Sequence, residues 1–245
     1  MIFLWLNLIL LLISFLLIIF VKKIALKYII YDKPDNDRKI HSAPVPLLGG
    51  VIFYIFLIIN TILSYEYLTS SLKLIILLIF LYSIFFILGF IDDKISLSPS
   101  KKTFILLIFL FLIIPLHQDL VIQNLVFKDL KFYIPLNQAN IFFTILCLYF
   151  FYNLINFSDG ANGITISLSI YWLLIFIFFG SINKLYIYSL IAPLVLILIF
   201  NLKNKIFLGN SGSSLLSITL ASLFIMNYNI DNSIKSDEIV LLMFI

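Results

Sequence analysis

NLINFSDGANG, residues 153–163, is the stretch around which the chain is organised. It follows an apolar run, Ile141–Tyr152, that is long enough to enter a membrane. Asparagines, an aspartate and glycines then stand where a membrane-spanning helix would meet water. Such groups are costly in a membrane unless they are solvated, paired or functional. A polar loop between two helices is the simplest interpretation of the stretch taken alone, so its meaning depends on the other polar segments.

The composition fixes the class of protein. Hydrophobic residues make up 63% of the chain and charged residues 11%, and the mean hydropathy is +1.17. Soluble domains carry about 25% charged residues, so the sequence predicts an integral membrane protein. The single cysteine, Cys147, lies in an apolar run and excludes a disulfide framework. The N-terminal apolar run has no basic residue before it, unlike a cleavable signal.

Apolar runs of this kind predict membrane-spanning helices, because about 20 residues cross the hydrocarbon layer. We expect eight complete helices, at about 2–21, 47–64, 72–90, 103–116, 141–157, 164–179, 185–200 and 215–226, and a truncated ninth from Ile239 to Ile245. The alternating segment 117–140 indicates a hairpin or an interfacial piece. The predicted fold is an all-α polytopic transmembrane helix bundle, a single domain over residues 1–245 that is incomplete at its C-terminus.

Basic residues predict the orientation of this bundle. Of the 16 Lys and Arg residues, 11 fall in the loops after the first, third and seventh predicted helices, and 5 fall on the other side. The richer side is expected in the cytoplasm, which places the N-terminus outside. Alternation puts residues 153–163 on the cytoplasmic side as well. The four polar segments of the chain can therefore converge on one cytoplasmic site.

The residue types in these segments suggest phosphate chemistry. Asp92 and Asp93 are adjacent acids, and hard cations such as Mg²⁺ prefer oxygen ligands and substrate phosphates. Lys102 could hold phosphate charge, and the glycines of the segment FLGNSGSS, residues 207–214, let backbone N–H groups approach an anion. Each feature alone has a plainer interpretation: a solvated acid pair, a turn at residues 209–212, and a loop histidine at His41.

Together, four motifs resemble those of the polyprenyl-phosphate N-acetylhexosamine-1-phosphate transferases, the WecA-, TagO- and MraY-like members of glycosyltransferase family 4. The resemblance covers nearly the whole chain and is closest to the WecA type. The motifs lie in the expected order: a first loop from Asp32-Lys33-Pro34 through Arg38-Lys39-Ile40-His41 to Pro46-Leu47-Leu48-Gly49-Gly50, then Gly89–Asp93, Asn153–Gly160 and Phe207–Ser213.

The resemblance implies transfer of a sugar-1-phosphate from a UDP-N-acetylhexosamine to a polyprenyl phosphate, with release of UMP and with Mg²⁺ or Mn²⁺ as cofactor. This is the first step of lipid-linked cell-envelope glycan synthesis, as in cell-wall or O-antigen pathways, on the cytoplasmic face of the inner (plasma) membrane. The implied catalytic residues are Asp92, Asp93 and Asp159; the substrate-binding residues are His41, Lys102, Asn153, Asn162, Phe207 and Gly209; the metal ligands are Asn156, Asn210 and Asp93. Phe207 would stack on the uracil and Asn162 would hydrogen-bond it.

Departures from the family pattern keep alternatives open. Asn210 stands where the family usually has Asp, Asn162 stands where bacterial members often have Asp, and the chain ends inside an apolar run. A catalytically impaired homologue or a fragment with a structural role is therefore one alternative. A secondary transporter is another, disfavoured because the ionisable residues lie at helix ends rather than mid-helix. We expect no nucleic-acid partner, and homodimer formation stays open.

Overall fold

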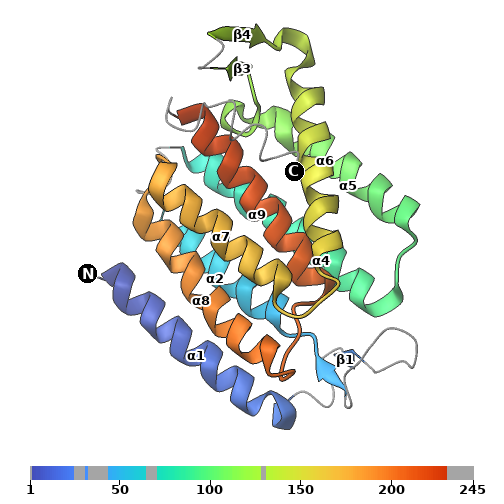
Figure 1. Ribbon diagram of the computed structural model, residues 1–245, viewed down its shortest axis with the longest axis vertical. Coiled ribbons are helices and arrows are strands. Elements are labelled where there is room, and N and C mark those ends of the chain that lie inside the picture. Colours follow the sequence, from blue (N-terminus) through green and yellow to red (C-terminus); the bar gives the residue numbers. More distant parts are fainter. Residues whose placement is uncertain (1, 25–30, 33–43, 65–70, 128–130, 231–245) are drawn as a thin grey trace.

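The structure, a computed structural model, describes residues 2–24, 31–32, 44–64, 71–127 and 131–230 as a bundle of long helices (Figure 1). Its α-helices, labelled as in Figure 1, are α1 (Ile2–Ile24), α2 (Gly49–Leu63), α4 (Leu72–Ile95), α5 (Pro99–Ile113), α6 (Asn140–Ser158), α7 (Ile164–Phe179), α8 (Lys184–Leu202) and α9 (Gly209–Ile230). Five helical segments among the described residues, those containing α4, α5, α6, α8 and α9, are long and apolar enough to cross a membrane. The expected all-α membrane architecture is confirmed. The predicted ninth run, 239–245, lies outside the described residues.

Short strands join the helices at the two ends of the bundle. β1 (Tyr31–Asp32) pairs antiparallel with β2 (Val45–Pro46), just before α2. At the other end, β3 (Asn124–Phe127) and β4 (Phe132–Pro135) pair antiparallel, with Asn124 opposite Pro135. The short 3₁₀ turns Ile114–Leu116, Gln118–Leu120 and Asn137–Ala139 flank this hairpin. Of the two interpretations of 117–140, a hairpin or an interfacial piece, the structure shows a hairpin.

α9 is the central helix, although it is the least apolar of the five candidate spans. Its mean hydropathy is 1.2, yet 89% of the spanning window is buried in the protein. It packs mainly against α4, α6 and α2 (Figure 1). Small hydroxyl residues line much of it, and those at positions 217, 219 and 222 donate to carbonyls three or four residues earlier in the helix. Because these hydroxyls are satisfied within α9, small side chains can let neighbouring helices approach closely.

Two predicted loops are shorter than expected, because helices continue past the apolar runs. α4 extends to Ile95 and α5 begins at Pro99, so the polar loop predicted over 91–102 contracts to 96–98. α9 begins at Gly209, so the loop predicted over 201–214 contracts to 203–208. The length of an apolar run reflects the thickness of the hydrocarbon layer, and the helix itself can continue beyond that layer into polar sequence. Both corrections move predicted site residues from loops onto rigid helix ends.

Candidate functional site

Backbone hydrogen bonds hold the start of α2 against the start of α9. Phe207 N–H donates to Pro46 O at 3.0 Å, Gly49 N–H donates to Phe207 O at 2.9 Å and Gly50 N–H donates to Leu208 O at 3.0 Å. A Cβ on Gly50 would collide with the backbone of Gly212. Only glycine permits this approach, so the first and fourth sequence motifs are joined directly.

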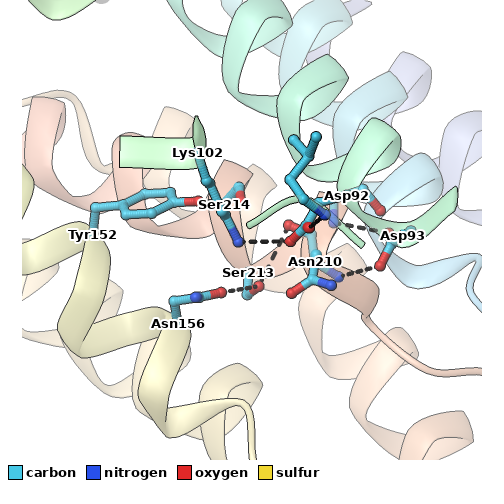
Figure 2. Close-up of polar contacts among 10 residues, drawn as sticks. Asp92, Asp93, Lys102, Tyr152, Asn156, Asn210, Ser213 and Ser214 are labelled. Atoms are coloured by element: carbon cyan, nitrogen blue, oxygen red, sulfur yellow. Dashed lines mark hydrogen bonds and ion pairs between the residues drawn. The ribbon is translucent and has the colours of Figure 1, made fainter. Parts of the chain in front are cut away.

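Asp93, near the end of α4, caps the N-terminus of α9. Its Oδ1 accepts the N–H of Asn210 at 2.8 Å and its Oδ2 accepts the N–H of Ser211 at 3.0 Å (Figure 2). A carboxylate is favourable at the positive end of a helix, where backbone N–H groups lack partners. Gly209, at φ +74°, makes the turn into the helix, and a Cβ there would lie 2.9 Å from Asp93 Oδ2. The anion bound by these N–H groups is therefore the protein's own carboxylate, whereas the sequence suggested an external one.

Asp92 forms a buried ion pair with Lys102, one helix away. Lys102 Nζ lies 2.8 Å from Asp92 Oδ2, and Leu97 N–H donates to Asp92 Oδ1 at 2.7 Å. Each residue is 9% exposed. The ammonium also lies 5.6 Å from the centre of the Tyr152 ring (Figure 2), within range of a cation–π interaction. The pair joins α4 to α5 beside α6.

The asparagines of α6 contact different partners. Asn156 Oδ1 accepts the hydroxyl of Ser213 at 3.3 Å, which links α6 to α9. Asn153 Nδ2 donates to the carbonyl of Tyr149 in its own helix at 2.8 Å. One turn from Asn156, the Tyr152 hydroxyl lies 3.1 Å from Ser214 Oγ. Asn156 therefore lies with Asp92 and Lys102 in one polar cluster around the first turn of α9 (Figure 2).

A cavity of about 850 Å³ opens beside this cluster. Six of the predicted site residues line it: Asp93, Asp159, Asn162, Phe207, Gly209 and Asn210. They come from α4, from the α6–α7 and α8–α9 connections and from the start of α9. Four predicted residues, Asp92, Lys102, Asn153 and Asn156, are not among its lining residues. His41 lies outside the described residues.

The cavity environment changes the acidity of Asp159, which directly follows α6. Burial raises the pKa of its carboxyl from the ordinary 3.8 to about 7. Hydrogen bonds with Thr165 and Ser213 oppose this rise, the negative charge of Asp93 adds to it, and the positive charge of Lys102 again opposes it. Burial disfavours the charged form of an acid, so Asp159 can exchange a proton near neutral pH.

Four further residues with polar side chains line the cavity but were not among the predicted site residues: Asp32, which belongs to the first motif, and Thr165, Asn201 and Asn204. Asn201 is 3% exposed, and its Oδ1 has no hydrogen-bond partner among the described residues. A buried amide oxygen without a partner is unusual in a folded protein. Both asparagines lie around the end of the apolar run of α8, in the same position relative to the membrane as residues 153–163. That position was the available signal, but the two side chains belong to no motif that we recognised.

The cavity offers oxygen ligands that suit a hard cation. Asp93, Asp159 and Asn210 line the same space, and each Asp93 oxygen keeps a lone pair beyond its bond to a backbone N–H. No group of three or more His, Cys, Asp or Glu side chains gathers in the part of the chain that the structure describes. Mg²⁺ typically takes one or two carboxylates and completes its shell with water and substrate phosphates. These residues therefore fit Mg²⁺ bound together with a phosphorylated ligand.

The family described as Glycosyl transferase family 4 matches residues 74–228, which is more than half of the chain. The match runs from the first turn of α4 to the last turn of α9 and so contains the capping aspartate, the ion pair and most of the cavity lining. No curated protein matches the chain.

Proposed function

Because the chain belongs to glycosyl transferase family 4, we propose that it transfers a sugar-1-phosphate of the N-acetylhexosamine type from a UDP-sugar to a polyprenyl phosphate. The cavity carries this proposal. Its lining combines carboxylates, amides and an aromatic ring, from Asp93, Asp159, Asn162, Phe207 and Asn210. Its volume of about 850 Å³ lies within the usual range for small-molecule sites, about 300–1,000 Å³.

The reaction exchanges one phosphorus–oxygen bond for another. An oxygen of the lipid phosphate attacks the β-phosphorus of the UDP-sugar and forms a new P–O bond. The bond from the β-phosphorus to the bridging oxygen breaks, and UMP leaves with the electron pair. The product is the lipid-diphosphate sugar. Two anions must meet in this step, so the protein has to position them and offset their repulsion.

We assign the metal to the α9 end of the cavity. Asp93 and Asn210 would hold Mg²⁺, or Mn²⁺, with Asn156 as a further amide ligand from the neighbouring cluster. When bound, the cation screens the diphosphate charge and stabilises the leaving UMP. Asn210 offers an amide oxygen without the charge of a carboxylate, so more of the required negative charge falls on Asp93. Asp159, with a pKa of about 7, accepts a proton from the lipid phosphate and keeps it dianionic.

The remaining residues bind the two substrates. Phe207 stacks on the uracil and Asn162 hydrogen-bonds it at the cavity rim. Lys102, held by Asp92 at 2.8 Å, supplies positive charge for the lipid phosphate on the α5–α6 side of α9. Gly209 lines the cavity where we place the diphosphate, while His41 and Asn153 contribute to substrate binding. We place the site at the cytoplasmic face of the inner membrane, where the product would start a lipid-linked envelope glycan.

The test is transfer by the purified full chain in detergent, supplied with polyprenyl phosphate, labelled UDP-N-acetylglucosamine and Mg²⁺. We expect UMP and lipid-diphosphate sugar in equal amounts. Asp159→Asn should lower the rate at least about a hundredfold, the lower end of the usual contribution of general-base catalysis. Lys184→Ala, an exposed change at the start of α8 and outside the cavity, is the matched control and should keep the wild-type rate. UMP release without a lipid product would contradict the assignment, and so would undiminished turnover in excess chelator.

A further inference from the structure

A second cavity, which we call the far pocket, lies at the end of α9 opposite the candidate site. Its volume is about 220 Å³, equivalent to roughly seven water molecules. The lining residues come from the α5–α6 connection and from the last turn of α9: Gln118, Asp119, Gln123, Asn124, Val126, Tyr228 and Asn229. The two ends of α9 lie about 30 Å apart at 1.5 Å per residue. Because α9 is long and apolar enough to cross a membrane, the two cavities lie on opposite sides of the bilayer.

Two side chains of α9 hold the wall of the far pocket in place. The Tyr228 hydroxyl accepts the backbone N–H of Val126 at 3.0 Å. The Asn229 Nδ2 group donates to the carbonyls of Asp119 and Val121, each at 3.0 Å. Strand β3 and the turn before it are thereby attached to the end of α9 through backbone groups. The shape of the pocket is therefore fixed before any ligand binds.

Backbone contacts also fix the direction of two amide side chains in this pocket. Asn229 cannot turn over without losing its bonds to two carbonyls, and its Oδ1 accepts no hydrogen bond from the part of the chain that the structure describes. Gln123 Oε1 accepts from Asn140 Nδ2 at 2.9 Å, and Asn140 Oδ1 in turn accepts the backbone N–H of Ile141 at 2.7 Å. Gln123 is therefore held with its N–H groups available. The far pocket offers a ligand one fixed acceptor and one fixed donor.

Asp119 supplies the one formal charge among the lining residues that the structure describes. Its side chain is 38% exposed, and His117 Nδ1 lies 3.7 Å from its Oδ2. That nitrogen accepts the backbone N–H of Asp119 at 3.3 Å, so in this arrangement it carries no proton to donate to the carboxylate. The carboxylate oxygens therefore remain available to donors on a ligand.

These groups distinguish between classes of ligand. A carboxylate with no cation in the lining repels phosphates and other anions. The N–H groups of Gln123 are unfavourable beside a metal ion, which takes oxygen ligands. A hydroxyl group both donates and accepts, so a ligand with several hydroxyls can satisfy the carboxylate, the fixed acceptor and the fixed donor together. Val126 and the Tyr228 ring add apolar surface for the C–H face of a sugar ring.

We propose that the far pocket binds one neutral saccharide ring, on the side of the membrane opposite the candidate site. Its volume is below the usual range for small-molecule sites, about 300–1,000 Å³, which suits a single ring rather than a nucleotide sugar. The site lies apart from the proposed reaction and does not depend on it. A free sugar and the head group of a glycolipid share this chemistry, and both can reach an end of the bundle at the membrane surface.

The experiment titrates the methyl glycosides of glucose, galactose and mannose into the full chain in phosphatidylcholine nanodiscs, with binding followed by ligand-observed NMR. Nanodiscs avoid detergents with sugar head groups, which would compete. We expect at least one glycoside to bind with a Kd of about 1 mM, the scale for so small a ligand. Nanodiscs that also contain a glycolipid with the same head group distinguish the two sources. Weaker apparent binding of the glycoside in them assigns the pocket to the glycolipid, and unchanged binding assigns it to the free sugar.

Two variants locate the binding in the far pocket. Asp119→Ala removes the carboxylate and Gln123→Ala removes the fixed donor. Neither side chain is buried, so the risk to folding is small, and melting temperatures close to that of the wild type should confirm this. Each variant should bind the glycoside about tenfold more weakly, the scale of one hydrogen bond. Gln138→Ala, an exposed glutamine at the same end that does not line the pocket, is the matched control and should bind as the wild type does.

Three results would overturn the proposal. The first is a wild type that binds none of the three glycosides. The second is binding that Asp119→Ala and Gln123→Ala leave unchanged. The third is binding of Ca²⁺ in the same nanodiscs that displaces the glycoside and is lost in Asp119→Ala, since it would identify a metal site instead. Transfer of sugar phosphate at the other end of α9 is measured separately, so none of these results bears on the proposed function.

Discussion

The burial of the Asp159 carboxyl group raises its pKa, and this pKa predicts the pH range in which the protein should work. Its carboxyl sits against the first turn of α7 and the start of α9, where Thr165 and Ser213 hydrogen-bond it. Burial outweighs these bonds and raises the pKa to about 7. A general base is most effective when its pKa lies near the working pH. The same shift that would suit Asp159 to the proposed role of a base also makes the stability of the folded state depend on pH.

We predict that activity and stability respond to pH in opposite directions. The folded pKa of about 7 lies above the ordinary 3.8, so between these values the folded protein binds a proton that the unfolded chain has released. The free energy of unfolding should therefore fall as the pH rises from about 4 to about 7. The transfer rate should rise over the upper part of this range, as Asp159 loses its proton.

The measurement is the rate of transfer and the melting temperature in detergent from pH 5 to pH 9. Asp159→Asn should lower the transfer rate and abolish the increase in rate near pH 7. It should also reduce the decrease in melting temperature with rising pH. The phosphate groups of the substrates titrate identically in both proteins, so they cancel in the comparison. An increase in transfer rate near pH 7 that persists unchanged in Asp159→Asn would show that another group causes it.

At the scale of elements, the start of α9 is the feature on which the site depends. Three helices meet there because glycines permit it: besides Gly50 of α2, a Cβ on Gly89 of α4 would collide with the backbone of Asn210 and Ser211. Asp93 then accepts the backbone N–H groups of Asn210 and Ser211. Asp93 is thus both a cavity residue and a structural cap, and a mutation there should change folding as well as chemistry.

We predict that Asp93→Asn destabilises the protein. An asparagine would present an NH₂ group to one of the two backbone N–H groups, so that at least one hydrogen bond is lost and a donor is left unpaired. Such a loss costs about 1–3 kcal/mol. Melting in detergent should therefore occur at a lower temperature than in the wild type.

Asn210→Ala is the matched control for this change. It removes a proposed ligand of the metal but keeps the backbone N–H that Asp93 accepts at 2.8 Å. Its melting temperature should stay close to that of the wild type while its transfer rate falls. Equal melting temperatures for Asp93→Asn and the wild type would show that the cap contributes little.

The sequence predicted the elements of this fold better than their ends. Apolar runs and the alternation in 117–140 identified the helices and the hairpin, because both are local patterns. The extension of α4 through Asp92 and Asp93 was missed, since charged residues at a helix end look like a loop when hydropathy alone is considered. The central position of α9 was missed for a similar reason: its serines lower its hydropathy, and only tertiary packing reveals that they let neighbouring helices approach.

Only the site residues that belong to recognised motifs could be predicted from the sequence. Motif residues such as Asp93, Asp159 and Phe207 line one cavity in the structure. The sequence could not show that Asp92 forms an ion pair with Lys102 while its neighbour Asp93 caps α9. Both contacts join separate helices and therefore depend on the tertiary fold. Asn204 could not be found at all from a motif, since its contact with Asn162 joins two loops 42 positions apart.

Across the whole molecule, the cavity and most of the basic residues belong to the same end. Among the described residues, the exposed lysines at helix ends or in loops beside the site are Lys94, Lys101, Lys203 and Lys205. Those at the opposite end are Lys73, Lys131 and Lys184. In the full sequence the division is 11 to 5. Positively charged loops tend to remain in the cytoplasm, so the charge distribution predicts which way the bundle lies in the membrane.

We predict that the site end of the bundle faces the cytoplasm. Single cysteines at Ser98 and Lys203, both exposed near the site, should react with a membrane-impermeant thiol reagent only after the inner face is opened. Cysteines at Lys131 and Lys184, exposed at the hairpin and at the start of α8, should react in intact cells. The native Cys147 is buried, so the unmodified chain is the control and should stay unlabelled. Labelling of Ser98→Cys in intact cells would contradict this prediction and place the cavity on the outer side of the membrane.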